Sequence, residues 1–537
     1  MGLFSRSILL VGIIVGGLSV LAGAFTTRPL LLNPPPVNSD SDLAGVVQQV
    51  NQIFEKRWGV EQIVPAEQAA DLKVLRRLSL ALHGTIPSVE EIRLFIADEE
   101  PARLERWLDR MLADPRFSDY FGERLARVFV GKETGQFVMF RRDLFLVWVR
   151  EQLQKQIPFD AMVREMISKE GLWTGEPATN FISAAVANQQ IDENKLAGRT
   201  VRAFLGQRMD CAQCHDHPFS HWKQEQFEGL AAWYGQVRTS LAGVVDQKGE
   251  YVVEDRKTLQ KRTVAPAVPF HPEWVPEKGT RRAKLAAWVT HPENRRFERA
   301  VANRIWALMF GRPYLDPVDD LPDPKPEGTD LLDILGKDFR THHYDLRRLI
   351  RVVALSRPFG LDSVLPQHVS SDVDTHRLVE AWGMFPLVRL RPEQVIGSML
   401  QASSIRTIDQ NSNFLIRTLR FVREADFIKN YGDLGENEVT DRGGTIPQTL
   451  MKMNGKLTRE LSDPNPFSAV GRINAFSGNH SQRVQIAYWA CLSRDPTSTE
   501  LMHFTGELSK VNEKQRPQVM SDLYWSLFNS PEFSWNH

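Results

Sequence analysis

Residues 193–227 read ENKLAGRTVRAFLGQRMDCAQCHDHPFSHWKQEQF, and this stretch joins the structural pattern of the chain to its most distinctive motif. Its first part, ENKLAGRTVRAFLGQRM, has the spacing of an amphipathic helix that leads directly into Cys211. On the far side of the motif, QEQFEGLAAWYGQV predicts a second, shorter helix. The stretch therefore predicts a helical fold in which a cysteine-containing loop lies between two helices.

The same helical periodicity continues on both sides of this stretch. In residues 43–58, apolar side chains recur three and four positions apart. A helix that ends at Gly84 is followed by Ser88 and Glu91, which have the spacing of a capping box at the start of the next helix. Helical patterns resume at about residue 278 and continue toward the C-terminal end of the sequence.

A change of pattern between the two helical regions predicts a boundary. The run GVVDQKGEYVVEDRKTLQKRTVAPAVPF alternates around Gly249 and predicts a small β-hairpin, and PFHPEWVPEKG predicts a proline-rich connection. We therefore predict a mainly α fold with helical domains at 42–239 and 278–537, joined by a hairpin and linker at 240–277. The length of 537 residues agrees with this division, because it exceeds what one hydrophobic core usually serves.

The charge balance argues against a nucleic-acid partner. Lys and Arg total 66, Asp and Glu also total 66, and the formal net charge is zero. Nucleic-acid-binding domains carry a clustered basic excess, which this composition lacks. The hydrophobic content of 42% and the charged content of 25% are those of an ordinary globular protein, so large buried cores are expected.

The N-terminal region has the composition of an export segment. Residues 8–25, ILLVGIIVGGLSVLAGAF, form an apolar run without charge, just under the roughly 20 residues that a membrane-spanning helix needs. The sequence AGA at 22–24 fits a signal-peptide cleavage site. We expect residues 1–28 to be a signal peptide or membrane anchor and residues 29–41 to be a proline-rich tether. The protein is then exported to the periplasm or cell envelope, and residues 8–25 anchor it in the membrane if they are not cleaved.

The C-x-x-C-H motif at Cys211, Cys214 and His215 predicts covalent attachment of haem c. Two thiols at this spacing add across the haem vinyl groups, and the adjacent histidine becomes an axial ligand of the iron. Attachment of this kind takes place outside the cytoplasm, in agreement with the predicted export. In this interpretation Cys211 and Cys214 are the anchors, His215 binds the haem iron, and a redox partner protein is implied. The second axial ligand would come from a distant part of the chain.

Two other interpretations use the same part of the sequence. Cys211, Cys214, His217 and His221 offer two sulfurs and two nitrogens to a zinc ion. Alternatively, a disulfide joins Cys211 to Cys214, because disulfides form and persist outside the cytoplasm. Haem, zinc and a disulfide without any cofactor therefore stay open at this stage. The remaining cysteine, Cys491, lies in an apolar helical pattern and is expected to be a small core residue.

Other polar residues carry weaker predictions. The adjacent His342 and His343 have metal-binding chemistry, but paired histidines in a turn are more often solvated. Asp319 and Asp320 lie in a proline-rich loop, where carboxylates more often cap a helix or turn than hold a cation. The sequence lacks the motifs of serine hydrolases, P-loop proteins, zinc metalloproteases and dinucleotide-binding folds. The catalytic residues are therefore unknown, and whether the protein is an enzyme stays open.

Long motifs in the sequence resemble two families that occur together. The planctomycete cytochrome-like domain, domain of unknown function 1549, is resembled by LRRLSLALHGTIPSVEEIRLFIAD, DRMLADPRFSDYFGERLARVF and RAFLGQRMDCAQCHDHPFSHWKQEQFEGLAAWY. Its usual companion, domain of unknown function 1553, is resembled by RAKLAAWVTHPENRRFERAVANRIWALMFGRPYLDPVDDL, LLDILGKDFRTHHYDLRRLIRVVALSRPF and DLYWSLFNSPEFSWNH. The likeness extends from about residue 45 to the end.

The resemblance implies an exported, mostly helical protein whose cytochrome-like motif is matched at Cys211, Cys214 and His215. Both family names record that the function is unknown, so the resemblance implies no reaction. We expect a redox protein that transfers electrons through a c-type haem. The alternative is a non-redox scaffold or binding protein of the cell envelope, in which the cysteine pair is a disulfide or zinc staple. A third possible function is that of a hydrolase, and the only sequence feature that supports it is the presence of carboxylates in loops.

Overall fold

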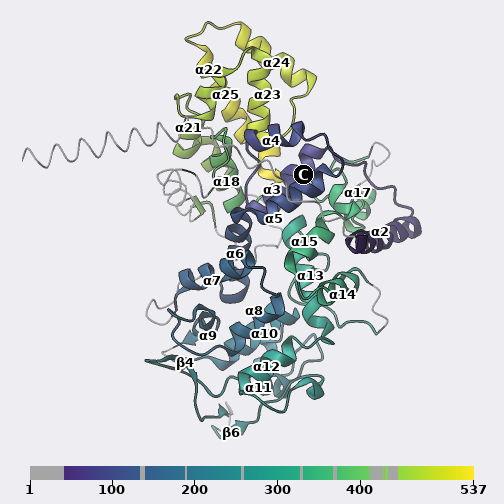
Figure 1. The fold of residues 1–537 in the computed structure, drawn as a ribbon, viewed down its shortest axis with the longest axis vertical. Helices are drawn as coiled ribbons and strands as arrows, with labels where there is room; N and C mark the ends of the chain where they lie inside the picture. Colours follow the sequence, from purple (N-terminus) through teal and green to yellow (C-terminus); the bar gives the residue numbers. More distant parts are fainter. Residues whose placement is uncertain are drawn as a thin grey trace, which may run out of the picture.

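The computed structural model is mainly helical, as the sequence predicts (Figure 1). It describes residues 41–132, 140–187, 190–254, 259–326, 330–366, 372–409, 412, 427–428, 430–432 and 445–537. The apolar run at 8–25 and all but the last residue of the predicted tether at 29–41 lie outside the described residues. Among the described helices, none has both the length and the apolar character that a membrane crossing requires.

Short helices build the first part of the chain. In chain order they are α2 (Ser41–Glu61), α3 (Asp71–His83), α4 (Val89–Ala97), α5 (Arg103–Ala113), α6 (Pro115–Val130), α7 (Arg142–Gln154), α8 (Phe159–Ser168), the 3₁₀ helix η1 (Pro177–Thr179), α9 (Asn180–Ser183), α10 (Glu193–Leu205), the 3₁₀ helix η2 (Asp210–Gln213) and α11 (Gln224–Ala232).

A second series of helices follows the strands in the middle of the chain. It consists of the 3₁₀ helix η3 (Pro272–Trp274), α12 (Arg281–Val289), α13 (Arg295–Phe310), α14 (Leu331–Thr341), α15 (Leu346–Ala354), α16 (Arg357–Gly360), α17 (Asp372–Glu380), α18 (Pro392–Ala402), α20 (Ile446–Asn454), α21 (Lys456–Ser462), α22 (Ala469–Phe476), α23 (His480–Leu492), α24 (Ser498–Ser509), α25 (Arg516–Asn529) and the 3₁₀ helix η4 (Glu532–Ser534).

The strands of the described residues form small antiparallel pairs. The pairs are β1 (Val186–Ala187) with β2 (Gln190–Ile191), β3 (Val237–Ser240) with β4 (Gly243–Asp246), β5 (Tyr251–Glu254) with β6 (Lys261–Val264), and β7 (Val388–Arg389) with β8 (Trp535–Asn536).

The segment 240–277 does contain an antiparallel strand pair, β5 with β6, but the turn predicted at Gly249 is wrong. Gly249 lies between β4 and β5, which belong to different sheets. The chain instead reverses at residues 241–242, so that Ser240 is paired with Gly243. Gly243 has a φ of 98°, and a Cβ at this position would lie 2.0 Å from the carbonyl oxygen of Gly171. A two-residue turn followed by a residue that must be glycine therefore closes the hairpin earlier than the alternating pattern suggested.

Two hydrophobic clusters fill the interior. The larger one extends from Val50 to Phe385 and contains side chains from both of the predicted helical domains. The smaller one combines residues between 390 and 533 with Leu80 and Ile86 from the first part of the chain. Helix α23 of the C-terminal group accordingly packs against α4 (Figure 1). Segments from opposite ends of the sequence therefore share one core, and the domain boundaries drawn from the sequence stay a prediction.

The helix-end signals near α3 and α4 are confirmed. Gly84 ends α3 with a φ of 67°, and a Cβ there would lie 2.3 Å from the ring of Tyr120. At the start of α4, the backbone N–H of Glu91 donates to Ser88 Oγ at 3.0 Å, and the backbone N–H of Ser88 donates to Glu91 Oε2 at 2.9 Å. Each of these two side chains thus satisfies a donor that the helix leaves unpaired.

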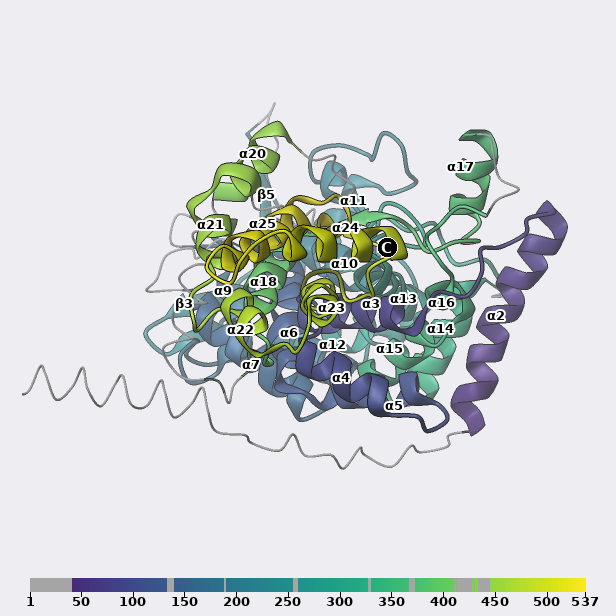
Figure 2. The ribbon, with the colours of Figure 1, turned by 90° about the horizontal axis from the view of Figure 1, so that it is seen from above.

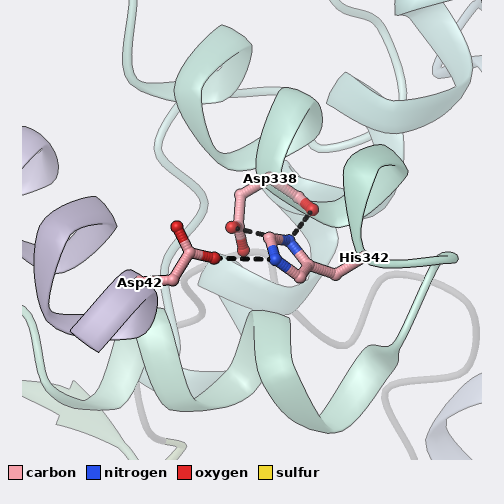
Figure 3. A group of neighbouring side chains, drawn as sticks. All are labelled: Asp42, Asp338 and His342. Atoms are coloured by element: carbon pink, nitrogen blue, oxygen red, sulfur yellow. Dashed lines mark hydrogen bonds and ion pairs between the residues drawn. The ribbon is translucent and has the colours of Figure 1, made fainter. Parts of the chain in front are cut away.

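Helix α2 runs along one edge of the molecule, and an ionic cluster fastens its first turn (Figures 1 and 2). Asp42 Oδ2 lies 2.8 Å from His342 Nε2 and 2.8 Å from the guanidinium of Arg348 (Figure 3). The carboxylate of Asp338, on α14, lies 3.0 Å from His342 Nδ1 and 3.0 Å from the same guanidinium. His342 therefore joins α2 to α14, whereas His343 is exposed as the sequence suggested.

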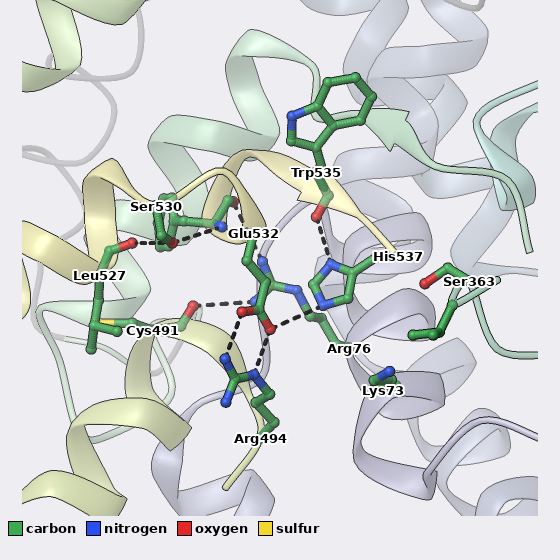
Figure 4. A network of polar contacts seen from close by, with 12 residues as sticks. Lys73, Arg76, Ser363, Cys491, Arg494, Leu527, Ser530, Glu532, Trp535 and His537 are labelled. Carbon is green, nitrogen blue, oxygen red and sulfur yellow. Dashed lines mark hydrogen bonds and ion pairs between the residues drawn. The ribbon is translucent and has the colours of Figure 1, made fainter. Parts of the chain in front are cut away.

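Two arginines on α3 are fully buried and bind backbone carbonyls from distant segments. The Arg76 guanidinium donates to the carbonyl oxygens of Cys491 at 3.2 Å and Phe533 at 3.4 Å (Figure 4). In the same network, Glu532 forms two contacts of 2.6 and 2.7 Å with Arg494 and one of 3.3 Å with His537. The C-terminal segment is thus fixed to α3 through hydrogen bonds in the protein interior.

Arg77 makes three hydrogen bonds of this kind. Its guanidinium donates to the carbonyl oxygens of Phe359 at 2.9 Å, Leu361 at 2.7 Å and His537 at 2.9 Å. Burial lowers the pKa of the Arg77 guanidinium to about 9, which still leaves it charged at neutral pH. A buried charge without these acceptors would be strongly destabilising, so the three carbonyls must stay in place around it.

We expect Arg77→Met to lower the free energy of unfolding by about 3 kcal/mol, because two buried carbonyl groups and the part-buried carbonyl of His537 lose their donor. The change is measured by urea denaturation of the full chain. Arg93→Met on α4 is the matched control, since Arg93 is exposed and its replacement should change the free energy of unfolding by less than about 0.5 kcal/mol. Equal effects of the two variants would contradict the structural role of Arg77.

His83, at the end of α3, is buried against a charged cluster. Its Nε2 lies 3.0 Å from the carbonyl oxygen of Met111, so Nε2 carries the proton. Burial and the neighbouring Arg116 guanidinium lower the pKa of His83 to about 4. Arg116 itself is paired with Glu91 at 2.6 Å and with Asp114 at 2.8 Å. His83 is therefore neutral in the folded protein at any pH well above 4.

We expect stability to fall as the pH decreases from about 6.5 toward 4, because the unfolded chain binds a proton on His83 that the folded protein excludes. His83→Gln keeps a donor for the Met111 carbonyl and should remove up to about 3 kcal/mol of this pH dependence. Free energies of unfolding at pH 7 and pH 4.5 test this. His376→Gln, at an exposed position on α17, should leave the pH dependence unchanged.

Candidate functional site

The C-x-x-C-H loop is positioned by the two helices that the sequence predicts on either side of it. Helix α10 ends at Gly206, which adopts a left-handed conformation with a φ of 60°. A Cβ on Gly206 would lie 3.2 Å from the Cβ of Ala300 on α13, so glycine allows the two helices to approach closely. After the loop, Trp222 is buried and α11 begins at Gln224.

The motif itself forms a short 3₁₀ turn, η2, with alternating buried and exposed side chains. Met209 and Ala212 are buried, and the backbone N–H of Ala212 donates to the carbonyl of Met209 at 2.8 Å. Cys211, Cys214 and His215 are all exposed. The two buried side chains therefore fix the turn to the protein body, while the three residues of the motif face solvent.

The imidazole of His215 is oriented by the backbone of the next residue, Asp216. Its Nδ1 lies 2.7 Å from the carbonyl oxygen of Asp216, and because a carbonyl only accepts, Nδ1 must be the protonated nitrogen. The other nitrogen, Nε2, then carries the lone pair that a metal requires, and this is the usual way in which a second hydrogen bond prepares a histidine ligand.

Asp216 forms the link between this histidine and the start of α11. Its carboxylate accepts hydrogen bonds from the backbone N–H of Gln224 at 3.0 Å and from Lys223 Nζ at 2.9 Å. These two donors, in that order, hold the pKa of the Asp216 carboxyl below its usual value. The residue after the motif therefore stays ionised and keeps the turn tied to the next helix.

The remaining histidines of the predicted zinc set make other contacts. His217 Nδ1 accepts a hydrogen bond from the backbone N–H of Phe219 at 3.2 Å, and His221 Nε2 lies 3.9 Å from a carboxylate oxygen of Asp323. Within the described residues, the predicted zinc ligands Cys211, Cys214, His217 and His221 do not bring three donor atoms within 4.8 Å of one another. A zinc site here would require the loop to rearrange.

A second loop, residues 315–323, lies directly against the C-x-x-C-H loop. The carboxylate of Asp319 is 2.7 Å from Arg208, and Asp320 accepts a hydrogen bond from the backbone N–H of Arg208 at 3.3 Å. Asp319 and Asp320 were expected to cap a helix or turn, and they instead bind the residue that precedes the motif. The sequence contained the acidic pair but gave no signal for its partner, which lies more than 100 positions away.

The 315–323 loop is held in turn by a buried side chain on α13. Asn303 Nδ2 donates to the carbonyl of Leu315 at 2.8 Å, and Asn303 Oδ1 accepts from the backbone N–H of the same residue at 2.9 Å. Because Asn303 is fully buried, its amide is satisfied only while the loop keeps this position.

Asp42, Asp338 and His342 are the one group of potential metal ligands that the described residues bring together, with all donor atoms within 4.8 Å (Figure 3). Arg348 already supplies a positive charge to this cluster, 2.8 Å from Asp42 and 3.0 Å from Asp338. The guanidinium thus bridges the two carboxylates, one on α2 and one on α14, and the cluster serves to dock α2.

The fold and this loop define a mainly helical protein with a solvent-facing C-x-x-C-H motif. Residues 49–239 match the family described as protein of unknown function (DUF1549), PSCyt2, and residues 281–416 match protein of unknown function (DUF1553), PSD1. The chain belongs to the proteins that carry these two domains in this order, which confirms the resemblance noted from the sequence. No curated protein and no solved structure matches the chain.

The residues of the motif fit the attachment of a haem. Cys211 and Cys214 are both thiols and both exposed, and His215 presents Nε2 as a ligand atom. Phe219, in the same loop, is 93% exposed and offers apolar surface next to the motif. When attached, haem would supply an iron centre that accepts and releases one electron.

We expect two of the three thiols to react when the folded, reduced protein is treated with iodoacetamide. Cys211 and Cys214 are exposed, whereas Cys491 is buried and burial raises the pKa of its thiol, which suppresses the reactive thiolate. Mass spectrometry counts the modified cysteines, and unfolding should release the third. Cys491→Ala is the control and should leave the count at two. Rapid reaction of Cys491 in the folded protein would contradict this arrangement.

Proposed function

We propose that the protein is an exported electron-transfer protein that carries a covalently attached c-type haem. The observation that carries this proposal is the geometry of one turn: the thiols of Cys211 and Cys214 and the Nε2 atom of His215 all face solvent, while Met209 and Ala212 anchor the turn from below. Haem attachment needs accessible thiols and a histidine whose free nitrogen faces outward, and this turn offers both.

Each residue of the motif has a separate role in this proposal. Cys211 and Cys214 form the two thioether bonds, and His215 is the axial ligand. Asp216 holds the tautomer of His215 through its carbonyl and connects the turn to α11 through its carboxylate. The backbone N–H of Gln224 and the ammonium of Lys223 both hold that carboxylate, which ties the ligand-bearing turn to the start of α11.

The location and partners follow from the same proposal. Covalent haem attachment occurs outside the cytoplasm, so residues 1–28 would export the protein to the periplasm or cell envelope, and residues 8–25 would hold it at the membrane if they are retained. Residues 29–41 would then act as the tether. An electron-transfer role also requires a redox partner protein, and the neutral net charge gives no reason to expect a nucleic acid.

The second candidate is a non-redox scaffold or binding protein in which Cys211 and Cys214 form a staple. The backbone N–H of Cys214 contacts the carbonyl of Cys211 at 3.5 Å, so the two cysteines lie within one turn. In an oxidising compartment an exposed pair of this kind is open to disulfide formation. Zinc binding is the other form of staple, and it requires His217 and His221 to move toward the thiols.

We expect protein matured in a host with haem-attachment machinery to show a Soret band and a c-type pyridine haemochrome spectrum. The double variant Cys211→Ala, Cys214→Ala should lose both, because no thioether bond can form. His215→Ala should lose or shift the Soret band, whereas His217→Ala is the matched control and should keep the wild-type spectrum.

The outcomes separate the candidates. Colourless protein with a mass two hydrogens below that of the reduced chain supports the disulfide staple, and stoichiometric zinc by elemental analysis supports the metal staple. Either result refutes the haem proposal. A haem that is retained after both cysteines are replaced would contradict the assignment of this motif as the attachment site.

A further inference from the structure

The C-x-x-C-H loop and the 315–323 loop belong to different family regions, yet they are in contact at both ends of the motif. The first loop lies within residues 49–239 and the second within residues 281–416. The contacts fall on residues 206–208, before the motif, and on His221, after it. The 315–323 loop therefore touches the chain where it enters and where it leaves the candidate site.

The inner contacts are one backbone–backbone and one side-chain–backbone hydrogen bond in a buried environment. The backbone N–H of Leu321 donates to the carbonyl of Gly206 at 2.8 Å, and Gln207 Nε2 donates to the carbonyl of Leu321 at 2.9 Å. Gln207 and Leu321 are both buried. Because neither bond can be replaced by water, the two loops are held at a fixed separation at this point.

The outer contacts are ionic. Arg208 pairs with Asp319 through its guanidinium, with contacts of 2.7 and 2.8 Å. On the other side of the motif, Asp323 lies 2.6 Å from Arg296 and 3.9 Å from His221. The Arg296 guanidinium also lies 5.5 Å from the ring centre of Trp222, so one arginine of α13 connects the acidic loop with the exit of the motif loop.

We infer that the 315–323 loop positions the C-x-x-C-H turn, with Gln207, Arg208 and Asp319 as positioning residues, so that the site is built from both family regions. The inference concerns the same turn as the proposed haem attachment, but it holds for any group that must engage both thiols together. It is tested on the protein without haem, so that its failure and the failure of the haem proposal are separate results.

The support from the second region adds to the contacts that the turn makes with its own flanking helices. Between Gly206 and Trp222, only Gln207, Met209 and Ala212 are buried, and the side chains of the motif face solvent. One ligand atom can bind two thiols only while the two sulfurs keep a suitable distance and orientation to each other. A support at the entrance and exit of the turn restricts their relative motion, which lowers the cost of binding both at once.

The test measures the affinity of phenylarsine oxide for the full, reduced chain, since one arsenic atom bonds to two neighbouring thiols with loss of water. We expect Arg208→Gln and Asp319→Asn each to weaken capture by about threefold or more. The double variant should bind no more weakly than either single variant, because the two residues act through one contact. Buried Cys491 does not contribute a second thiol.

The matched controls replace another arginine–carboxylate pair of the second region. Arg312 and Glu380 are 2.6 Å apart, and Arg312→Gln and Glu380→Gln should leave capture unchanged. Circular dichroism and urea midpoints verify that all variants fold. Unchanged capture in both Arg208→Gln and Asp319→Asn, or fully additive losses in the double variant, would overturn the inference. The second readout is alkylation by iodoacetamide, which modifies one thiol at a time. Its rate at Cys211 and at Cys214 should change less than twofold in the variants, because the exposure of each thiol is unaffected.

Discussion

The buried guanidinium groups of Arg76 and Arg77 are the constraint on which the arrangement of the helices depends. Removing a guanidinium from water costs several kcal/mol unless acceptors surround it. Here the acceptors are backbone carbonyls from residues 359–361, 491 and 533–537, which are far from α3 in the sequence. A side-chain acceptor can reach a donor by changing its rotamer, but a backbone carbonyl moves only with its chain segment. These segments must therefore occupy fixed positions around α3. This explains why the helices at the C-terminal end share a core with α3 and α4.

Helix packing connects α3 to the candidate site. Helix α13 packs against α3 and also against α10, which leads into the C-x-x-C-H loop. The close contact between Gly206 and Ala300 fixes α10 to α13 at its last turn. Asn303 and Arg296, also on α13, hold the acidic loop and the exit of the motif loop. One helix of the second region therefore contributes to holding the chain on both sides of the motif.

The sequence predicted local features well, because they depend on neighbouring residues. The helical character, the glycine end of α3, the capping box of α4 and the helices on either side of the motif all follow from spacing and backbone chemistry. The resemblance to the two families was confirmed for the same reason, since long motifs are read directly from the chain.

The features that the sequence missed depend on partners that are distant along the chain. Nothing near Arg76 and Arg77 in the sequence indicates that both are buried, because their acceptors come from other segments. Asp319 and His342 likewise appeared to be ordinary loop residues, and their partners are Arg208 and Asp42. The pairing of β3 with β4 was missed because the alternating pattern continues past the real turn, whose position depends on contact between Gly243 and Gly171.

These observations separate the part of the protein that determines stability from the part that carries chemistry. The buried charges of α3 and the two hydrophobic clusters lie in the interior, whereas Cys211, Cys214 and His215 are exposed on a turn at the surface. Replacing an exposed side chain leaves no cavity and no unpaired buried group, so changes in the motif should leave the helical body intact. A loss of haem or of dithiol capture in such a variant then reports on the site itself, since the helices that position it are held by contacts that the substitution does not touch.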